Sequence, residues 1–79
     1  MLDTQFRILE SCMRPSGAWA QSHGTFIDES AARERFVRHF WHGPEYGIVW
    51  SKTVQLTKSW WAEGAYHRDV IATRIIGFE

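Results

Sequence analysis

The sequence has few of the features that cross-link a small domain or direct it to a membrane. Cys12 is the single cysteine, so no internal disulfide can form. The apolar runs are only a few residues long, far short of the roughly 20 residues that cross a bilayer. The first residues lack the basic segment and apolar segment of a signal peptide. We therefore expect a complete small gene product that is cytoplasmic and has no membrane contact.

An excess of charge of one sign is also missing. Nine Lys and Arg balance nine Asp and Glu, so the formal net charge is zero. This balance excludes a strongly basic nucleic-acid coat protein and an acidic DNA mimic that acts through bulk charge. With 44% hydrophobic residues, the composition is typical of a folded domain. The length of 79 residues predicts a single domain over residues 1–79.

The first third of the chain predicts a β-hairpin. Phe6 and Ile8 fall on one face of an alternating stretch at residues 4–13, and a second apolar stretch spans residues 18–27. Between them stands Pro-Ser-Gly at residues 15–17. Proline presets φ for a turn and glycine accepts positive φ, so we expect the chain to reverse there.

A helix is predicted at residues 28–42. Asp28 suits the N-cap position, because its carboxylate can accept hydrogen bonds from the first turn. Gly43 and Pro44 form a stop signal, with glycine as the residue that follows the helix end. Apolar residues recur at helical spacing and predict a stripe that faces the core: Ala32, Phe36, Val37 and Phe40.

A period of two returns after the helix. The alternating apolar residues of this run are Tyr46, Ile48, Trp50, Val54, Leu56 and Trp60. The run is too long for one ordinary strand, so we expect two strands joined near residues 51–53, with a single long bent strand as the alternative. A turn at residues 62–64 leads to a last strand at about residues 67–78.

These elements predict an α+β fold of two layers in the order β-β-α-β-β-β. Hairpins favour antiparallel pairing, and one helix covers only one face of a sheet. We therefore expect an antiparallel sheet of about five strands with the helix on one face. The polar residues that alternate with Val54 and Leu56 indicate that the second face of the sheet is exposed to solvent.

Five tryptophans are a large number for a chain of this length. Packing in the core accounts for Trp50 and for one of the neighbours Trp60 and Trp61, since adjacent strand residues point to opposite faces. We expect Trp60 beneath the helix and Trp61 on the open face. An exposed tryptophan favours contact with a partner.

Cationic side chains gather towards the end of the predicted helix. Arg35, Arg38 and His42 lie three and four residues apart. A solvated face with a Glu34–Arg38 ion pair is the structural interpretation, and contact with an acidic partner is the functional one. The candidate partner-binding residues are therefore Arg35, Arg38, His39, His42 and Trp61.

Motifs for catalysis and cofactor binding are missing. The pair His39 and His42, with His23 or His67 as a further ligand, is a weak zinc pattern because zinc sites usually add cysteine or a second clear pair. Histidines that complement a helix dipole are the simpler interpretation. No glycine-rich phosphate loop is present, and Cys12 is expected to be a buried apolar residue. We predict no enzyme activity, no cofactor and no metal ligand.

The order of elements supports one resemblance. A hairpin that ends in Gly24-Thr25-Phe26, a capped helix from Asp28 to His42 and a return into antiparallel strands resembles small phage-encoded anti-CRISPR proteins. The resemblance implies a cytoplasmic inhibitor that docks on a CRISPR effector complex and blocks DNA binding or nuclease recruitment. It assigns no role to any residue, and the neutral charge favours steric blocking.

We therefore predict a non-enzymatic, protein-binding inhibitor of phage or mobile-element origin that acts in the host cytoplasm. Its partner would be a host protein or nucleoprotein complex, and the inhibitor itself would be a monomer or a homodimer. The alternative function is a small nucleic-acid-binding protein that uses Arg35, Arg38, Lys52 and Lys58 for phosphates and an exposed tryptophan for stacking. Protein docking is favoured over direct nucleic-acid contact.

Overall fold

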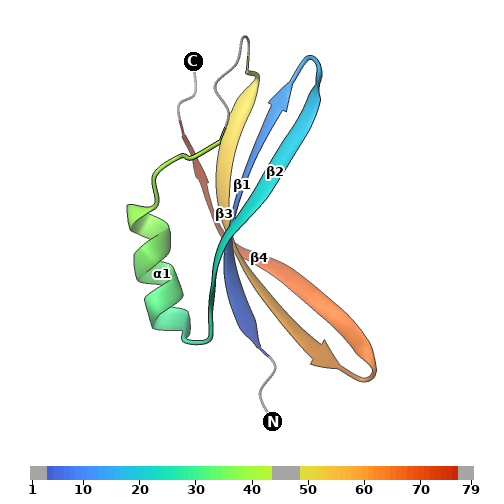
Figure 1. Cartoon of the computed structure of the whole chain (residues 1–79). Coiled ribbons are helices and arrows are strands. Elements are labelled where there is room, and N and C mark those ends of the chain that lie inside the picture. Colours follow the sequence, from blue (N-terminus) through green and yellow to red (C-terminus); the bar gives the residue numbers. More distant parts are fainter. Residues whose placement is uncertain (1–3, 44–48, 77–79) are drawn as a thin grey trace.

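A four-stranded antiparallel sheet with one helix on one face forms the fold (Figure 1). The computed structural model describes residues 4–43 and 49–76. The sheet has the strand order β2-β1-β3-β4, and each neighbouring pair is antiparallel. The elements are β1 (Gln5–Arg14), β2 (Gly17–Phe26), α1 (Glu29–Arg38), β3 (Ser51–Ala62) and β4 (Ala65–Ile75).

The predicted α+β class, antiparallel sheet and single covering helix are confirmed, but the number of strands differs. The described residues contain four strands in the order β-β-α-β-β, not five. The expected strand around Tyr46 and Ile48 lies outside the described residues. Trp50 is not in a strand, and β3 is one strand of 12 residues that begins at Ser51. Among the described residues, none forms a helix long and apolar enough to cross a membrane.

Two-residue loops close both hairpins, at residues 15–16 and 63–64. Glu63 and Gly64 have φ angles of 55° and 76°. Two successive positive φ values are the mark of a type I′ turn, whose twist matches that of the flanking strands. Both predicted turns are therefore present.

The core lies between α1 and the two central strands. In β1 every second residue is buried, because successive strand side chains point to opposite faces. Phe26, Trp41 and Ile71 pack against the core from its margin. The cluster of buried apolar residues is small and consists of Phe6, Ile8, Ala32, Phe36, Val54 and Leu56.

α1 begins where the sequence predicts but ends earlier. The Oδ2 atom of Asp28 accepts a hydrogen bond from the Ala31 N–H at 2.9 Å, which confirms the N-cap. The helix stops at Arg38, and the backbone of His39 is already extended. Arg74 of β4 donates hydrogen bonds to the carbonyl oxygens of Val37 and His39, both at 2.7 Å. These carbonyl groups are thus satisfied without a further helical turn.

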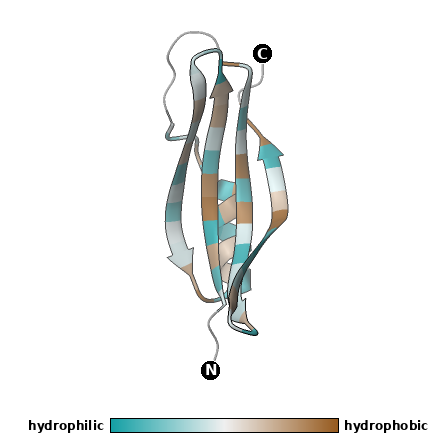
Figure 2. Ribbon diagram, turned by 90° about the vertical axis from the view of Figure 1, so that its right-hand side faces the viewer, coloured by the Kyte–Doolittle hydropathy of each residue, from teal (hydrophilic) through white to brown (hydrophobic). Residues whose placement is uncertain are grey.

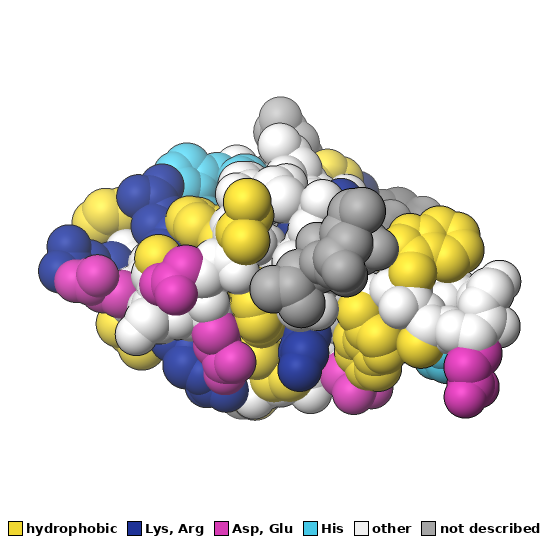
Figure 3. Space-filling view, turned by 90° about the horizontal axis from the view of Figure 1, so that it is seen from below, with side chains coloured by type: hydrophobic (Ala, Val, Ile, Leu, Met, Phe, Trp, Pro, Cys, Tyr) yellow, Lys and Arg dark blue, Asp and Glu magenta, His cyan; other side chains and the backbone are white. Residues whose placement is uncertain are grey.

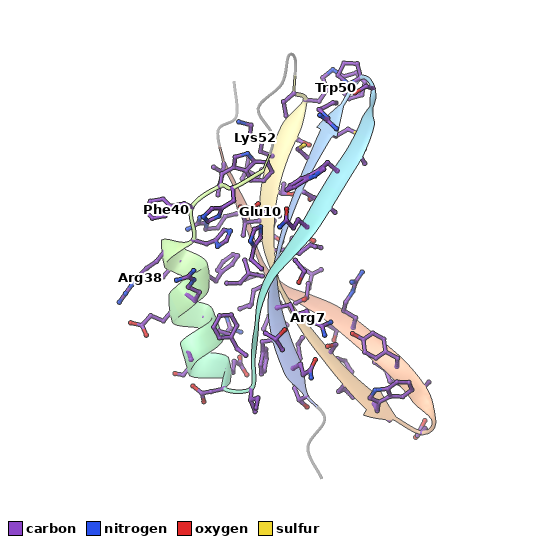
Figure 4. The ribbon with its side chains drawn as sticks, viewed as in Figure 1. Arg7, Glu10, Arg38, Phe40, Trp50 and Lys52 are labelled. Carbon is purple, nitrogen blue, oxygen red and sulfur yellow. The ribbon has the colours of Figure 1, made fainter. Side chains whose placement is uncertain are left out.

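The early end of α1 explains why part of the predicted core is wrong. Phe40 lies beyond the helix and is 78% exposed, so the helical spacing that aligned it with Phe36 no longer applies. Val37 is 63% exposed, because its position in α1 turns it away from the sheet. Trp50, expected in the core, is exposed near the β1–β2 turn (Figure 4).

Contrary to the prediction, Gly43 does not follow the end of the helix, because α1 already stops at Arg38. A Cβ atom at this residue would lie 2.5 Å from the Trp41 ring and 2.6 Å from the Trp19 ring. The two rings themselves meet edge to face, with centroids 5.8 Å apart. Glycine is therefore required because the chain passes directly against two indole rings, and not because a helix ends there.

Phe36 and Phe40 form a matched pair for a stability measurement. We expect Phe36→Ala to lower the free energy of unfolding by about 3–5 kcal/mol, because Phe36 is buried and its removal leaves a cavity. Phe40→Ala should change it by no more than about 0.5 kcal/mol. Chemical denaturation followed by tryptophan fluorescence measures both values. Equal losses in the two variants would contradict the observed end of the helix.

Candidate metal centre

A buried carboxylate lies in the middle of the helix-facing side of β1. Glu10 alternates with Ile8 and Cys12, and its side chain has no exposed surface. Figure 4 shows it on the α1 side of the sheet, with Arg7 on the opposite side. Burying a charged group is strongly unfavourable unless it has close partners. The surroundings of Glu10 therefore decide whether this part of the fold is stable.

Three histidine side chains surround the Glu10 carboxylate. The Nε2 atom of His23 lies 2.8 Å from Oε1, and the Nε2 atom of His39 lies 2.8 Å from Oε2. The Nδ1 atom of His42 lies 3.4 Å from Oε2, and the His42 backbone N–H donates to the same oxygen at 2.6 Å. We call Glu10, His23, His39 and His42 the His-Glu cluster.

A bulge in β2 brings His23 to the helix-facing side. Phe26 pairs with Phe6 and His23 pairs with Ile8, so Gly24 is the extra residue between Arg7 and Ile8 on the partner strand. Gly24 has a φ of 72°, a conformation that glycine adopts readily. Without the extra residue, positions 23 and 26 would point to opposite faces of the sheet. The bulge therefore lets both Phe26 and His23 face the helix layer.

The other two histidines come from the segment that follows α1. The hydrogen bond from Arg74 to the His39 carbonyl oxygen fixes the start of this segment. Packing of Trp41 against Trp19 fixes its middle, and the Lys52 ammonium lies 5.7 Å from the centroid of the Trp41 ring. Two separate parts of the chain, β2 and the segment after α1, thus converge on the carboxylate that β1 carries.

The spacing of the cluster suits a metal ion. The four ligand atoms all lie within 4.8 Å of one another. With metal–nitrogen bonds of about 2.0–2.1 Å, tetrahedral geometry places ligand atoms about 3.4 Å apart and imidazole centroids about 5 Å apart. The three imidazole centroids are separated by 5.0, 5.2 and 5.0 Å. An ion in place of the bridging protons would require the closest contacts to open by about half an ångström and the widest, which reaches 4.8 Å, to close by roughly 1.4 Å.

The electrostatics of the cluster favour an ionised carboxylate and a neutral imidazole. Burial alone would raise the pKa of Glu10, but the hydrogen bonds from the His42 N–H, His39 and His23 outweigh it and lower this pKa. Burial lowers the pKa of His39, and the neighbouring His23 and His42 add to that effect against the opposing influence of Glu10. A charged carboxylate and a neutral imidazole are the forms that bind metals.

The cluster is closed on one side and open on the other. The side chains of Glu10 and His39 are 0% and 1% exposed, whereas that of His42 is 52% exposed. A solvent-facing ligand provides a path for an ion to enter. The Nδ1 atom of His39 has no hydrogen-bond partner in the described part of the protein, so the described side chains do not complete this network.

The structure separates the residues that the sequence placed on one helix face. His39 is buried at 5% exposure, and His42 lies beyond the helix, so neither lines an exposed stripe with the arginines. Arg38 is exposed and paired with Glu34 at 2.6 Å, as expected. Arg35 is exposed and lines a groove of about 530 Å³ beside His23. Trp61 is 60% exposed on the other side of the sheet, as its position next to Trp60 predicts.

Sequence reasoning missed Glu10 and left His23 as one option among several. Glu10 carries a usable signal, because a charged residue at a core-facing position of an alternating strand requires buried partners. The position of His23 depends on the Gly24 bulge, which simple alternation does not reveal. No protein-family model matches the chain, and the searches of curated proteins and solved structures also find no match.

The two pKa shifts predict that acid destabilises the metal-free protein. Stability from Glu10, whose pKa is lowered by folding, is present above its ordinary pKa and is lost as the pH falls through the lowered value. His39 also has a lowered pKa, so protonation of the unfolded chain below about 6.5 favours unfolding. We expect the free energy of unfolding, measured with a chelator, to fall steadily as the pH drops from about 7 to 4.

His67→Ala and His39→Gln make this pH measurement specific. His67 lies in β4, outside the cluster, so its replacement should leave the pH profile unchanged. His39→Gln should remove part of the loss at mildly acidic pH. A stability that stays constant or rises between about pH 7 and 4 would contradict the assigned charge states.

Proposed function

We propose that this protein binds a late first-row divalent metal ion, with Zn²⁺ as the best-fitting example, through the His-Glu cluster. One observation carries the proposal. Three imidazole nitrogens and a buried carboxylate oxygen, delivered by β1, β2 and the segment after α1, lie within 4.8 Å of one another. The proposal departs from the expectation, based on the sequence, that no metal is bound.

The donor set determines the class of ion. Three nitrogen atoms and one oxygen atom suit Zn²⁺, Co²⁺, Ni²⁺ and Cu²⁺, whereas Ca²⁺ and Mg²⁺ prefer oxygen ligands. Zn²⁺ has no geometric preference from its d electrons and accepts the tetrahedral arrangement that the imidazole spacing suits. Four protein ligands are typical of structural zinc sites.

A structural role fits the size of the domain. The core is small, the chain has one cysteine, and small domains commonly need a disulfide, a metal or a partner for stability. An ion in the His-Glu cluster would join two strands of the sheet to the segment that leaves the helix. Binding at about a thousand times the dissociation constant would add about 4 kcal/mol to the stability of the folded state.

A hydrogen-bond network without metal is the competing explanation. In that case Glu10 is satisfied by His23, His39 and the His42 backbone N–H. One feature favours the metal. The imidazole of His42 also turns its Nδ1 atom towards the carboxylate, although the backbone of the same residue already donates to it.

The anti-CRISPR-type inhibitor remains a prediction from the sequence. A fold stabilised by metal would serve docking on a host nucleoprotein complex as well as any other binding role. The metal proposal therefore concerns how the protein is held together and does not identify its partner.

Metal titration tests the proposal directly. Protein treated with a chelator and dialysed should bind one equivalent of Zn²⁺ in isothermal titration calorimetry. Co²⁺ should give the intense visible absorption of a tetrahedral site. His42→Ala should weaken binding at least tenfold, because it removes one ligand, and its half-exposed position means that the fold is retained.

His67→Ala is the matched control for this titration. His67 stacks on Trp60 with centroids 5.4 Å apart and lies outside the cluster, so the variant should bind Zn²⁺ as the unchanged protein does. Absence of binding, or equal affinity of the His42→Ala variant and the unchanged protein, would leave the hydrogen-bond network as the explanation.

A further inference from the structure

No described element covers the sheet face opposite α1. Figure 2 looks onto this face, with the helix behind the sheet. Register places Arg7 opposite Thr57 and Trp61 opposite Tyr66, and alternation turns all four away from the helix layer. We call this side of the sheet the open face.

Two aromatic rings stand exposed on the open face near the β3–β4 turn. Trp61 is 60% exposed and Tyr66 is 49% exposed, and their ring centroids are 5.6 Å apart at an angle of 66°. This hairpin projects away from α1, and hydrophobic side chains gather on it at the right of Figure 3. The edge-to-face arrangement leaves ring surface available for stacking.

Cationic groups flank these rings. Arg68 lies opposite Ser59 on β3, two residues from Tyr66, and Arg7 lies on the same face of β1. A hydrogen bond with Ser59 is the largest cause of the lowered pKa of Tyr66, and Arg7 and Arg68 lower this pKa further. Both guanidinium groups therefore lie close enough to the aromatic pair to make its surroundings electropositive.

Acidic groups are missing from the open face in the described ranges. Glu29 and Glu34 pair with arginines of α1, and Asp28 caps that helix. Glu10 and Asp69 fall on the helix-facing side of the sheet by register, and Glu63 stands in the β3–β4 turn. The charges of the chain sum to zero, but they are distributed unequally between the two faces of the sheet, and the open face is positive.

Apart from Trp61, the β3 positions on the open face are polar, whereas β1 and β4 add apolar side chains to the same face: Leu9, Met13, Val70 and Ile75. Ser11 and Thr53 hydrogen-bond to each other at 2.8 Å, and Gln55 follows on β3. Thr57 is held by a hydrogen bond to the Arg7 carbonyl oxygen at 3.3 Å. Hydroxyl and amide side chains next to aromatic rings and arginines can also hydrogen-bond to the phosphate and sugar oxygens of a nucleic acid.

From this combination we infer that the open face binds single-stranded nucleic acid, with a base stacked on Trp61 and Tyr66 and phosphates paired with Arg7 and Arg68. Aromatic side chains stack on any base, and guanidinium groups pair with phosphate oxygens through two hydrogen bonds. Two arginines are few for an intact duplex, which is bound chiefly through many phosphate contacts.

This surface differs from the one that the sequence suggested for phosphates. Arg38 is neutralised by Glu34, and both belong to α1 on the other layer. Arg35 also belongs to α1 and lines the groove beside His23. The open face contains no member of the His-Glu cluster, so the present inference and the metal proposal succeed or fail separately.

Fluorescence anisotropy with a labelled oligothymidylate of about 12 nucleotides tests the inference, using the full chain at about 50 mM salt. We expect measurable binding that weakens as the salt is raised to about 200 mM. Trp61→Ala should weaken binding at least about tenfold, because it removes the stacking platform. Arg68→Ala should weaken it several-fold and lower the salt dependence, because one phosphate contact is lost.

Two exposed residues elsewhere supply matched controls. Trp50 is 57% exposed, close to the value for Trp61, and Arg35 is exposed on α1, so Trp50→Ala and Arg35→Ala should bind as the unchanged protein does. Denaturation curves check that Trp61→Ala remains folded. Absence of binding at low salt, equal binding by Trp61→Ala, or tighter binding of a duplex of the same length would each overturn the inference.

Discussion

A carboxylate without exposed surface, set among apolar side chains on β1, is the constraint on which the rest of this structure depends. Glu10 cannot stay charged in that place without close partners. The chain supplies them by bulging β2 at Gly24 and by ending α1 at Arg38, so that His39 turns towards the sheet. The layer above the sheet is therefore organised around one ionised group as much as around the apolar core.

The two faces of the sheet have different chemistry as a result. On the helix-facing side lie the core, the His-Glu cluster and all the acidic side chains that register assigns to a strand face in the described ranges. The open face carries two arginines, two exposed aromatic rings, a polar row along β3 and exposed apolar side chains of β1 and β4. This separation lets a chain of zero net charge present a positive surface, which composition alone cannot show.

Local signals made much of the fold predictable. The Asp28 cap and both turns depend on neighbouring residues, and the alternation of β1 follows from strand geometry. The end of the helix could not be predicted from neighbouring residues. The carbonyl groups of Val37 and His39 are satisfied by Arg74, which lies 35 residues from His39 in the sequence. The cluster depends on a bulge and on contacts across 13 to 32 residues, so periodicity placed its histidines on a helix face instead.

Long-range ¹⁵N–¹H spectra of the histidine rings, recorded before and after one equivalent of Zn²⁺, test the central claim most directly. The account predicts that the Nε2 resonances of His23 and His39 and the Nδ1 resonance of His42 shift to values typical of metal-bound nitrogen. The resonances of His67 should stay in place, because that ring stacks on Trp60 away from the cluster. Unchanged resonances of the three cluster histidines, or a shift confined to His67, would contradict it.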